Sequence, residues 1–235
     1  MSELVRYRLE GKTAVVEMDD GKANALSDAM IAAVITALTR AEGEASAVVL
    51  AGRPERFCAG FDLRVMMSGP DRAKALLTNG SELLMRLYGS PLPVVIACTG
   101  HALAGGALVV LTGDVRIAAA GAFKIGLNEV AIGMPVPVLA MELARDRLSP
   151  TALTRATLLA HVHTPAEALA AGYVDEVVAP EEVMTRALAE AARLGALGRM
   201  PFAATKERLR GKSIAHIRSS LESDMRALMF PTGPA

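Results

Sequence analysis

The sequence predicts an α/β fold, because short apolar runs suited to buried strands alternate with longer segments of helical periodicity. Residues 47–51 and 94–97 are continuous apolar runs bounded by glycine or proline, a pattern typical of strands buried on both faces of a sheet. Met30, Ile31 and Val34 recur with the spacing of one helix face. With 235 residues, 52% of them hydrophobic, the chain can bury a substantial core.

Local signals define the elements of the first half of the chain in order. Residues 4–9 and 13–18 predict a β-hairpin, because residues 10–12 are a turn-forming Glu-Gly-Lys cluster. Ser27 is a candidate N-cap for a helix that ends near Gly43. After the two buried runs, further strands are expected at residues 115–118 and 122–125.

The last quarter of the chain is predicted to be helical. A strand over residues 173–178 precedes the helices, which are expected at residues 181–194, 201–210 and 214–229. Residues 66–92 are expected to be a loop that folds over the site and sets the depth of its pocket. Because no linker rich in glycine, serine or proline divides the chain, we predict an α/β core over residues 1–180 with a helical extension over residues 181–235.

Charge and aromatic content argue against nucleic-acid and membrane functions. Lysine plus arginine and aspartate plus glutamate both number 25, so the chain lacks the net positive charge that would attract nucleic acid or an anionic membrane. Aromatic residues make up 3% and tryptophan is absent, which provides few stacking surfaces for bases. Residues 91–113 are long enough to span a bilayer, but their glycines and unanchored flanks favour a buried segment instead.

Cysteine use and the N-terminal residues predict a cytoplasmic protein. Cys58 and Cys98 lie 40 residues apart with no further cysteine, so neither a disulfide framework nor a zinc site is indicated. The N-terminal residues alternate between polar and apolar side chains and include acidic ones, unlike a secretory signal or a transit peptide.

Two glycine-containing turns each follow a predicted strand. One spans residues 56–63, and the other spans residues 99–108 and leads into an apolar helix. Glycine lets a ligand approach the backbone closely, and the first amides of a helix have no partner within it. Two such turns on neighbouring strands can direct two amides at one carbonyl oxygen and so form an oxyanion hole. Taken alone, each turn is more often a packing device.

Glu129 is the only carboxylate between Asp114 and Glu142, and its neighbours are almost wholly apolar. An apolar environment raises the pKa of a carboxyl group toward the range useful for proton transfer near neutral pH. The alternative is an exposed loop glutamate, and composition alone favours neither interpretation.

Other polar and sulfur-containing residues are given structural interpretations. His101 adjoins the second turn and is expected to pack or cap, because no aspartate is spaced to orient it. His161 and His163 precede Thr164, a candidate N-cap, and two histidines alone make a poor metal site. The methionines near these segments are interpreted as core residues, some of which could line a flexible pocket: Met66, Met67, Met85 and Met134.

Taken in order, the motifs resemble the crotonase superfamily, the enoyl-CoA hydratase and isomerase family. The resemblance covers most of the chain and rests on residues 22–26, 57–63, 100–106, 126–129, 165–169 and 172–175. It implies a crotonase (ClpP/crotonase-like) spiral of strand-strand-helix units with a C-terminal helical trimerisation region over residues 181–235. It also implies a homotrimer or a hexamer built as a dimer of trimers, acting in fatty acid β-oxidation.

The resemblance further implies the roles of the site residues. The amides of Phe61 and Gly105 hold the thioester oxygen of an acyl-CoA, and Glu129 transfers the proton. Contacts to CoA and the acyl chain are implied for Lys22, Ala23, Ala25, Leu26, Ala59, Gly60, Asp62, Leu63, Ala104, Gly106 and Leu108. No metal or cofactor is expected, since coenzyme A is part of the substrate. Lys206 or Arg210 is a candidate for the CoA phosphates, although a helix of this composition is usually a solvated face.

One position departs from the pattern of the hydratases. Hydratases of this family carry a second glutamate one helical turn beyond the oxyanion glycine, where this chain has Leu108. Leucine neither holds a water molecule nor exchanges a proton. The remaining Glu129 suffices to shift a double bond, so we favour a 3-enoyl-CoA to 2-enoyl-CoA isomerase. The alternatives are an enoyl-CoA hydratase or another crotonase-type lyase or hydrolase, and a non-catalytic acyl-CoA-binding homologue.

Overall fold

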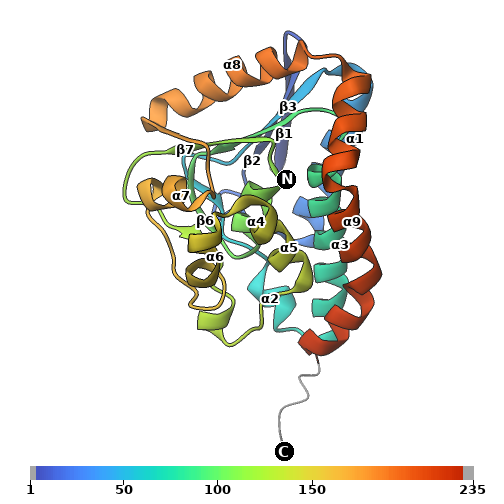
Figure 1. Ribbon diagram of the computed structural model, residues 1–235, viewed down its shortest axis with the longest axis vertical. Coiled ribbons are helices and arrows are strands. Elements are labelled where there is room, and N and C mark those ends of the chain that lie inside the picture. The colour runs from blue at the N-terminus through green and yellow to red at the C-terminus, as the bar shows by residue number, and fades with distance from the viewer. Residues whose placement is uncertain (1–3, 230–235) are drawn as a thin grey trace, which may run out of the picture.

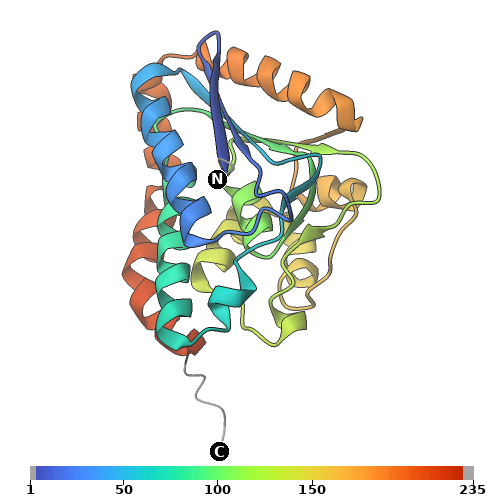
Figure 2. The same ribbon diagram turned by 180° about the vertical axis from the view of Figure 1, so that it is seen from behind.

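The strands form two sheets, a larger one that carries the core and a smaller one that carries the glycine turns. The computed structural model describes residues 4–229 (Figures 1 and 2). The larger sheet has the order β1-β2-β3-β5-β7-β9, and the smaller has the order β4-β6-β8. Only β1 runs antiparallel to its neighbour; the other pairs in both sheets are parallel. The strands are β1 Val5–Glu10, β2 Thr13–Met18, β3 Ala47–Ala51, β4 Glu55–Cys58, β5 Val94–Cys98, β6 Gly100–Leu103, β7 Val115–Ala119, β8 Ile125–Gly126 and β9 Glu176–Val178.

Helices cover both faces of the larger sheet. They are α1 Asp28–Glu44, α2 Leu63–Met66, α3 Pro70–Tyr88, α4 Gly105–Thr112, α5 Val138–Arg147, α6 Pro150–Ala156, α7 Pro165–Ala171, α8 Val183–Gly195 and α9 Arg199–Met229, with short 3-10 turns at Val130–Ile132 and Pro180–Glu182. Strand β3 shows why its sequence is apolar throughout. Val49 packs in the cluster under α8, whereas its neighbours Val48 and Leu50 face the larger core.

Helices α1, α3 and α9 lie side by side along one flank of the molecule (Figure 2), and α9 also contacts α5. The inner face of α9 carries Ile217 and Met225, both buried. Asp224, on the same face, accepts a hydrogen bond of 2.7 Å from the amide of Val138, the first residue of α5. This carboxylate caps α5, whose N-cap residue Pro137 has no capping side chain.

A buried ion cluster joins α9 to the end of α4. Asp114 Oδ2 lies 2.6 Å from Lys206 Nζ, and Asp114 Oδ1 lies 3.0 Å from Arg210 Nη2. Arg210 also donates to the carbonyl oxygen of Tyr88 at 2.7 Å. Lys206 and Arg210 are only 5% and 4% exposed, so the interpretation of this helix face as solvated is wrong. Asp114 pairs with both cationic side chains inside the fold.

Most expected elements are present, with some differences in extent. The strand expected at residues 122–125 is confined to β8, and the one expected at residues 173–178 to β9. The two helices expected at residues 201–210 and 214–229 are one continuous helix, α9. Gly211 does not interrupt it, because buried contacts on both sides, at Arg210 and Ile217, hold the helix in place. Residues 66–92 are largely the helix α3 and not a loop.

None of the helices in the described residues is long and apolar enough to cross a membrane. Residues 91–113, the one stretch with the length for it, are divided among β5, β6 and α4.

Candidate active site

The two glycine turns predicted from the sequence meet at the ends of β4 and β6. A Cβ on Gly60, whose φ is +96°, would lie 3.2 Å from the amide nitrogen of Gly105. A Cβ on Gly106 would lie 2.0 Å from the carbonyl oxygen of Cys58, so the start of α4 rests directly against the end of β4. Only glycine allows this close approach. The structure therefore brings the two predicted turns into contact.

The amide groups of Phe61 and Gly105, one in each turn, have no backbone partner in residues 4–229. Leu26 forms an isolated parallel bridge with Phe61: Leu26 N donates to Gly60 O at 2.8 Å, and Asp62 N donates to Leu26 O at 3.2 Å. In such a bridge the N–H of the central residue, here Phe61, points away from the partner strand. Gly105 is the first residue of α4, so its N–H has no partner inside the helix.

Ala104, which connects β6 to α4, has the backbone angles φ 47° and ψ −120°. A residue with a side chain rarely adopts these angles, and such strain concentrates where a turn has a function. The turn places the start of α4 directly after β6, and the positive end of the helix dipole coincides with the unpaired amide of Gly105.

A cavity of about 210 Å³ adjoins the turns and is mostly apolar. Among the residues singled out in the sequence, it is lined by Ala59, Phe61, Leu63, Ala104, Gly105, Leu108 and Glu129. The remaining lining residues come from α2, α3, β6 and the segment that follows β8: Met66, Leu77, Leu103, Asn128, Ile132, Met134 and Pro137. Met66 and Met134 thus face the cavity, whereas Met67 is 85% exposed and does not belong to the core.

Glu129 is the one carboxylate that lines this cavity, and it is only 6% exposed. It is therefore not an exposed loop glutamate. Burial raises the pKa of its carboxyl group, although backbone amides of Asn128 and Glu129 oppose the shift. Its Oε2 atom has no hydrogen-bond partner within the described residues. The Glu129 carbonyl accepts from the amides of Ile132 and Met134, which fixes the turn that carries the side chain.

Leu108 also lines this cavity, one helical turn after the start of α4, and it is 3% exposed. Its side chain has no atom that donates or accepts a hydrogen bond. The structure thus places a methyl-terminated side chain where the resemblance implies a second carboxylate in hydratases.

The remaining predicted residues lie in the turns or next to them and do not line the cavity: Lys22, Ala23, Ala25, Leu26, Gly60, Asp62 and Gly106. Ala59 N donates to Ala23 O at 3.0 Å, and the buried Asn24 side chain donates to Arg56 O at 3.0 Å. These bonds attach residues 22–26 to the first turn. The side chain of Asp62 caps α2 by accepting from the amide of Arg64 at 2.9 Å.

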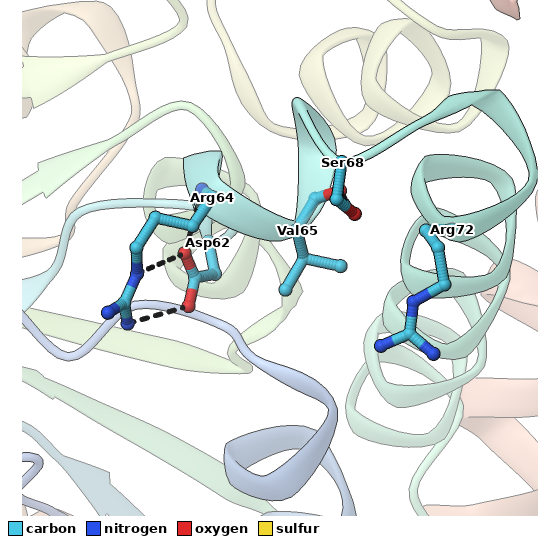
Figure 3. A pocket seen from close by; sticks show the side chains of 5 residues that line it. All are labelled: Asp62, Arg64, Val65, Ser68 and Arg72. Carbon is cyan, nitrogen blue, oxygen red and sulfur yellow. Dashed lines mark hydrogen bonds and ion pairs between the residues drawn. The ribbon is translucent and has the colours of Figure 1, made fainter.

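An arginine-lined depression lies on the other side of α2 (Figure 3). Leu63 and Met66 of this helix face the cavity, while Arg64 and Val65 face the depression. Asp62 holds the Arg64 guanidinium at 3.2 Å, and this pairing lowers the pKa of the Asp62 carboxyl. Arg72 approaches from the start of α3 (Figure 3). Sequence reasoning missed Arg64 and Arg72, although both closely follow the first glycine turn.

The histidines do not contribute to the cavity lining. His101 Nδ1 accepts from the amide of Lys124 at 3.0 Å, and its ring packs against Phe123, as the packing interpretation predicts. His161 and His163 stack edge to face before Thr164, which caps α7 as predicted. Across residues 4–229, no three potential metal-binding side chains come together.

Comparison with known proteins identifies the fold and the family of this chain. The structure has the crotonase fold: it matches an enoyl-CoA hydratase/isomerase family protein and human mitochondrial delta3-delta2-enoyl-CoA isomerase, each with a TM-score of 0.93. A family model described as enoyl-CoA hydratase/isomerase matches residues 8–230. The chain therefore belongs to the enoyl-CoA hydratase/isomerase family of the crotonase superfamily, whose members act on acyl-CoA substrates.

Some relatives similar to this chain are named as isomerases and others as hydratases. Enoyl-CoA delta isomerase 1, mitochondrial, from Homo sapiens is 32% identical over 217 residues, covering 90% of this chain and 72% of the relative. A Mycobacterium tuberculosis protein, called an enoyl-CoA isomerase in one solved structure and a probable enoyl-CoA hydratase in another, is 41% identical in the first, with a TM-score of 0.91 and coverage of 97% of this chain and 99% of its own. An enoyl-CoA hydratase from Mycobacterium ulcerans is also 41% identical, with a TM-score of 0.93 and coverage of 97% and 100%.

Proposed function

We propose that this protein isomerises 3-enoyl-CoA to 2-enoyl-CoA. The observation that carries the proposal is that one buried carboxylate, Glu129, and the apolar side chain of Leu108 line the same cavity. Hydration needs groups that hold a water molecule and exchange its protons, whereas a double-bond shift needs one base that can reach two carbon atoms. The cavity contains one such base, Glu129, and position 108 carries a leucine that cannot hold water.

The proposed reaction moves a single proton. The Glu129 carboxylate takes a proton from C2 of the 3-enoyl thioester, and the electrons of that C–H bond pass through the C2–C1 bond to the thioester oxygen. The amides of Phe61 and Gly105 stabilise the resulting dienolate, and loss of one such donor typically raises the barrier by about 3–4 kcal/mol. The protonated Glu129 then gives the proton to C4, which leaves the double bond between C2 and C3. The substrate and the product have the same mass.

The surroundings of the cavity fit a CoA thioester. We infer that residues 22–26 and the first turn contact the adenine and pantetheine, and that Arg64 and Arg72 contact the phosphates across α2 from the cavity. Guanidinium groups bind phosphate oxygens with charge-assisted hydrogen bonds. Neither a metal nor a further cofactor enters the proposed reaction. We also propose the homotrimer or hexamer for which the helical extension supplies contacts.

Product analysis tests the proposed function. Purified protein is incubated separately with 3-hexenoyl-CoA and with crotonyl-CoA, and the products are followed by ultraviolet absorbance and mass spectrometry. We expect 3-hexenoyl-CoA to gain the absorbance of a conjugated enoyl thioester without a change in mass. Addition of water to crotonyl-CoA at a comparable rate would show that Leu108 does not prevent hydration. Binding without turnover of either thioester would instead support an acyl-CoA-binding homologue.

The pH dependence of the reaction should report Glu129. The base must be ionised, and burial raises its pKa above the ordinary value of 4.5. We therefore expect kcat/KM for isomerisation to fall as the pH is lowered through a value clearly above 4.5. The measurement is a pH–rate profile between pH 4 and 9, with enzyme stability checked at each pH. An acid limb centred at or below the ordinary glutamate pKa would contradict the assignment of Glu129 as the base.

A further inference from the structure

The aromatic ring of Phe61 occupies a slot between α3 and α4 that two glycines leave open. A Cβ on Gly80 would lie 2.1 Å from Phe61 Cε1 and 2.5 Å from Cζ. On the other side of the ring, a Cβ on Gly105 would lie 3.0 Å from both Cδ2 and Cε2. Atoms that are not bonded cannot approach to 2.1 Å, so position 80 admits no side chain while the ring is in place.

Nothing within α3 itself requires glycine at position 80. The residue lies inside a helix of 19 residues, is buried and does not have a positive φ. Glycine in a helix interior is less favourable than alanine, so a reason outside the helix is needed. In contrast, a Cβ added to Gly43, in the last turn of α1, would have no atom within 4 Å.

The ring is connected to the group that we assign to catalysis. The Phe61 backbone is fixed on one side by the bridge with Leu26. Its side chain is fixed on the other side by Gly80 and Gly105. Displacing the ring would shift the Phe61 backbone, and the N–H that points away from the bridge would shift with it. A shift of about 1 Å in a catalytic group can slow a reaction by roughly a hundredfold.

We propose that Gly80 is a positioning residue for the oxyanion hole: the absence of a side chain there seats the Phe61 ring and so orients the Phe61 amide. The inference rests on the proposed function insofar as that amide is assigned to the thioester oxygen. It assigns a functional role to a residue of α3 that does not itself line the cavity.

The first test is Gly80→Ala. The ring can yield into the adjoining cavity of about 210 Å³, so the protein should remain folded. We expect kcat for isomerisation to fall by roughly tenfold to a hundredfold, because one of two oxyanion donors is turned away. KM should rise as well, because the displaced ring enters the cavity assigned to the substrate, so the loss of kcat at saturating substrate is the part that reports the oxyanion donor. Gly43→Ala is the matched control. It adds the same Cβ at a helical position where no other atom would lie within 4 Å of it, and it should leave kcat unchanged.

The second test is rescue by Phe61→Leu. Leucine has no atoms at the ε and ζ positions, which are the ones that a Cβ on residue 80 would strike. The remaining δ position, Phe61 Cδ1, lies at 3.4 Å from that Cβ, an ordinary contact. Combining Phe61→Leu with Gly80→Ala should therefore recover most of the kcat that Gly80→Ala alone removes. A role for Gly80 only in the stability of α3 predicts no such recovery.

A spectroscopic readout separates failure of this inference from failure of the proposed function. The thioester carbonyl of bound hexanoyl-CoA, labelled with ¹³C, should show a lowered stretching frequency in the wild type, because two amides polarise it. We expect the shift to diminish in Gly80→Ala and to return in the double variant. An unshifted carbonyl in the wild type would contradict the oxyanion hole itself. A normal shift and normal kcat in Gly80→Ala would overturn the role of Gly80 alone.

Discussion

Replacing Glu129 by glutamine is expected to reduce the double-bond shift by about 10³–10⁴-fold, the upper range for removal of a general base. Glutamine has nearly the same shape and can still form hydrogen bonds, but it cannot take a proton from C2 or return one to C4. The cavity lined by Phe61, Leu108 and Glu129 keeps its form, so CoA thioester binding should stay within a few fold. The measurement is kcat on 3-hexenoyl-CoA together with the Kd of hexanoyl-CoA.

The same substitution should stabilise the fold at neutral pH. Because the folded-state pKa of Glu129 is raised, the folded protein binds more protons than the unfolded chain between the ordinary pKa and the raised one. The free energy of unfolding therefore decreases as the pH rises through that window. Above it, the ionised buried carboxylate destabilises the folded state. Glu129→Gln removes this destabilising charge, so the variant should have a higher Tm than the wild type at pH 7. The difference in Tm should be smaller at pH 4.5. A lower activity with a higher Tm is typical of a group retained for function.

Glu82→Gln provides the control, because Glu82 is an exposed residue of α3. It should leave both activity and Tm near the wild-type values. Turnover close to the wild type in Glu129→Gln would require another base, and the cavity offers no second carboxylate among its lining residues.

The sequence was sufficient for features that depend on near neighbours. The buried strands, the glycine turns and the apolar surroundings of Glu129 were predictable because each depends on residues adjacent in the chain. The helix α3 was not predicted, although Pro70 begins it and Leu76, Leu77 and Leu83 suit its buried face. Asn79-Gly80 is a common turn signal, yet here Gly80 makes room for the Phe61 ring. A contact distant in sequence had overridden the local signal.

The ion cluster of Asp114, Lys206 and Arg210 also could not be predicted from neighbouring residues in the sequence. Lys206 and Asp114 are 92 residues apart in the chain, and nothing in the composition of α9 distinguishes a buried lysine from a solvated one. A long cationic side chain on a helix is usually exposed, and only the fold supplies the carboxylate that reverses this expectation.

Removing the charge of Asp114 should have the largest effect on stability. Asp114→Asn would leave Lys206 and Arg210 buried without a counter-charge, and breaking a buried pair in this way typically costs about 3–5 kcal/mol. A natural domain has only about 5–15 kcal/mol of stability in total, so a large part of it would be lost. The measurement is the free energy of unfolding from urea denaturation. Glu190→Gln, which breaks the surface pair with Arg193, should cost about 1 kcal/mol or less.

The pH dependence of stability tests whether the buried charge causes the destabilisation of Asp114→Asn. Burial lowers the pKa of Lys206 to about 8 even with Asp114 opposing the shift, so the pKa should fall further in Asp114→Asn. The unfolded chain then binds more protons than the folded one between that lowered pKa and the ordinary value of 10.5. Stability should consequently rise with pH through this window, and more so in the variant than in the wild type. Adding Lys206→Met, which removes the uncompensated charge, should recover part of the lost stability at pH 7 and abolish the extra pH dependence. If Asp114→Asn and Glu190→Gln cost the same, α9 is held by its apolar contacts and not by the ion cluster.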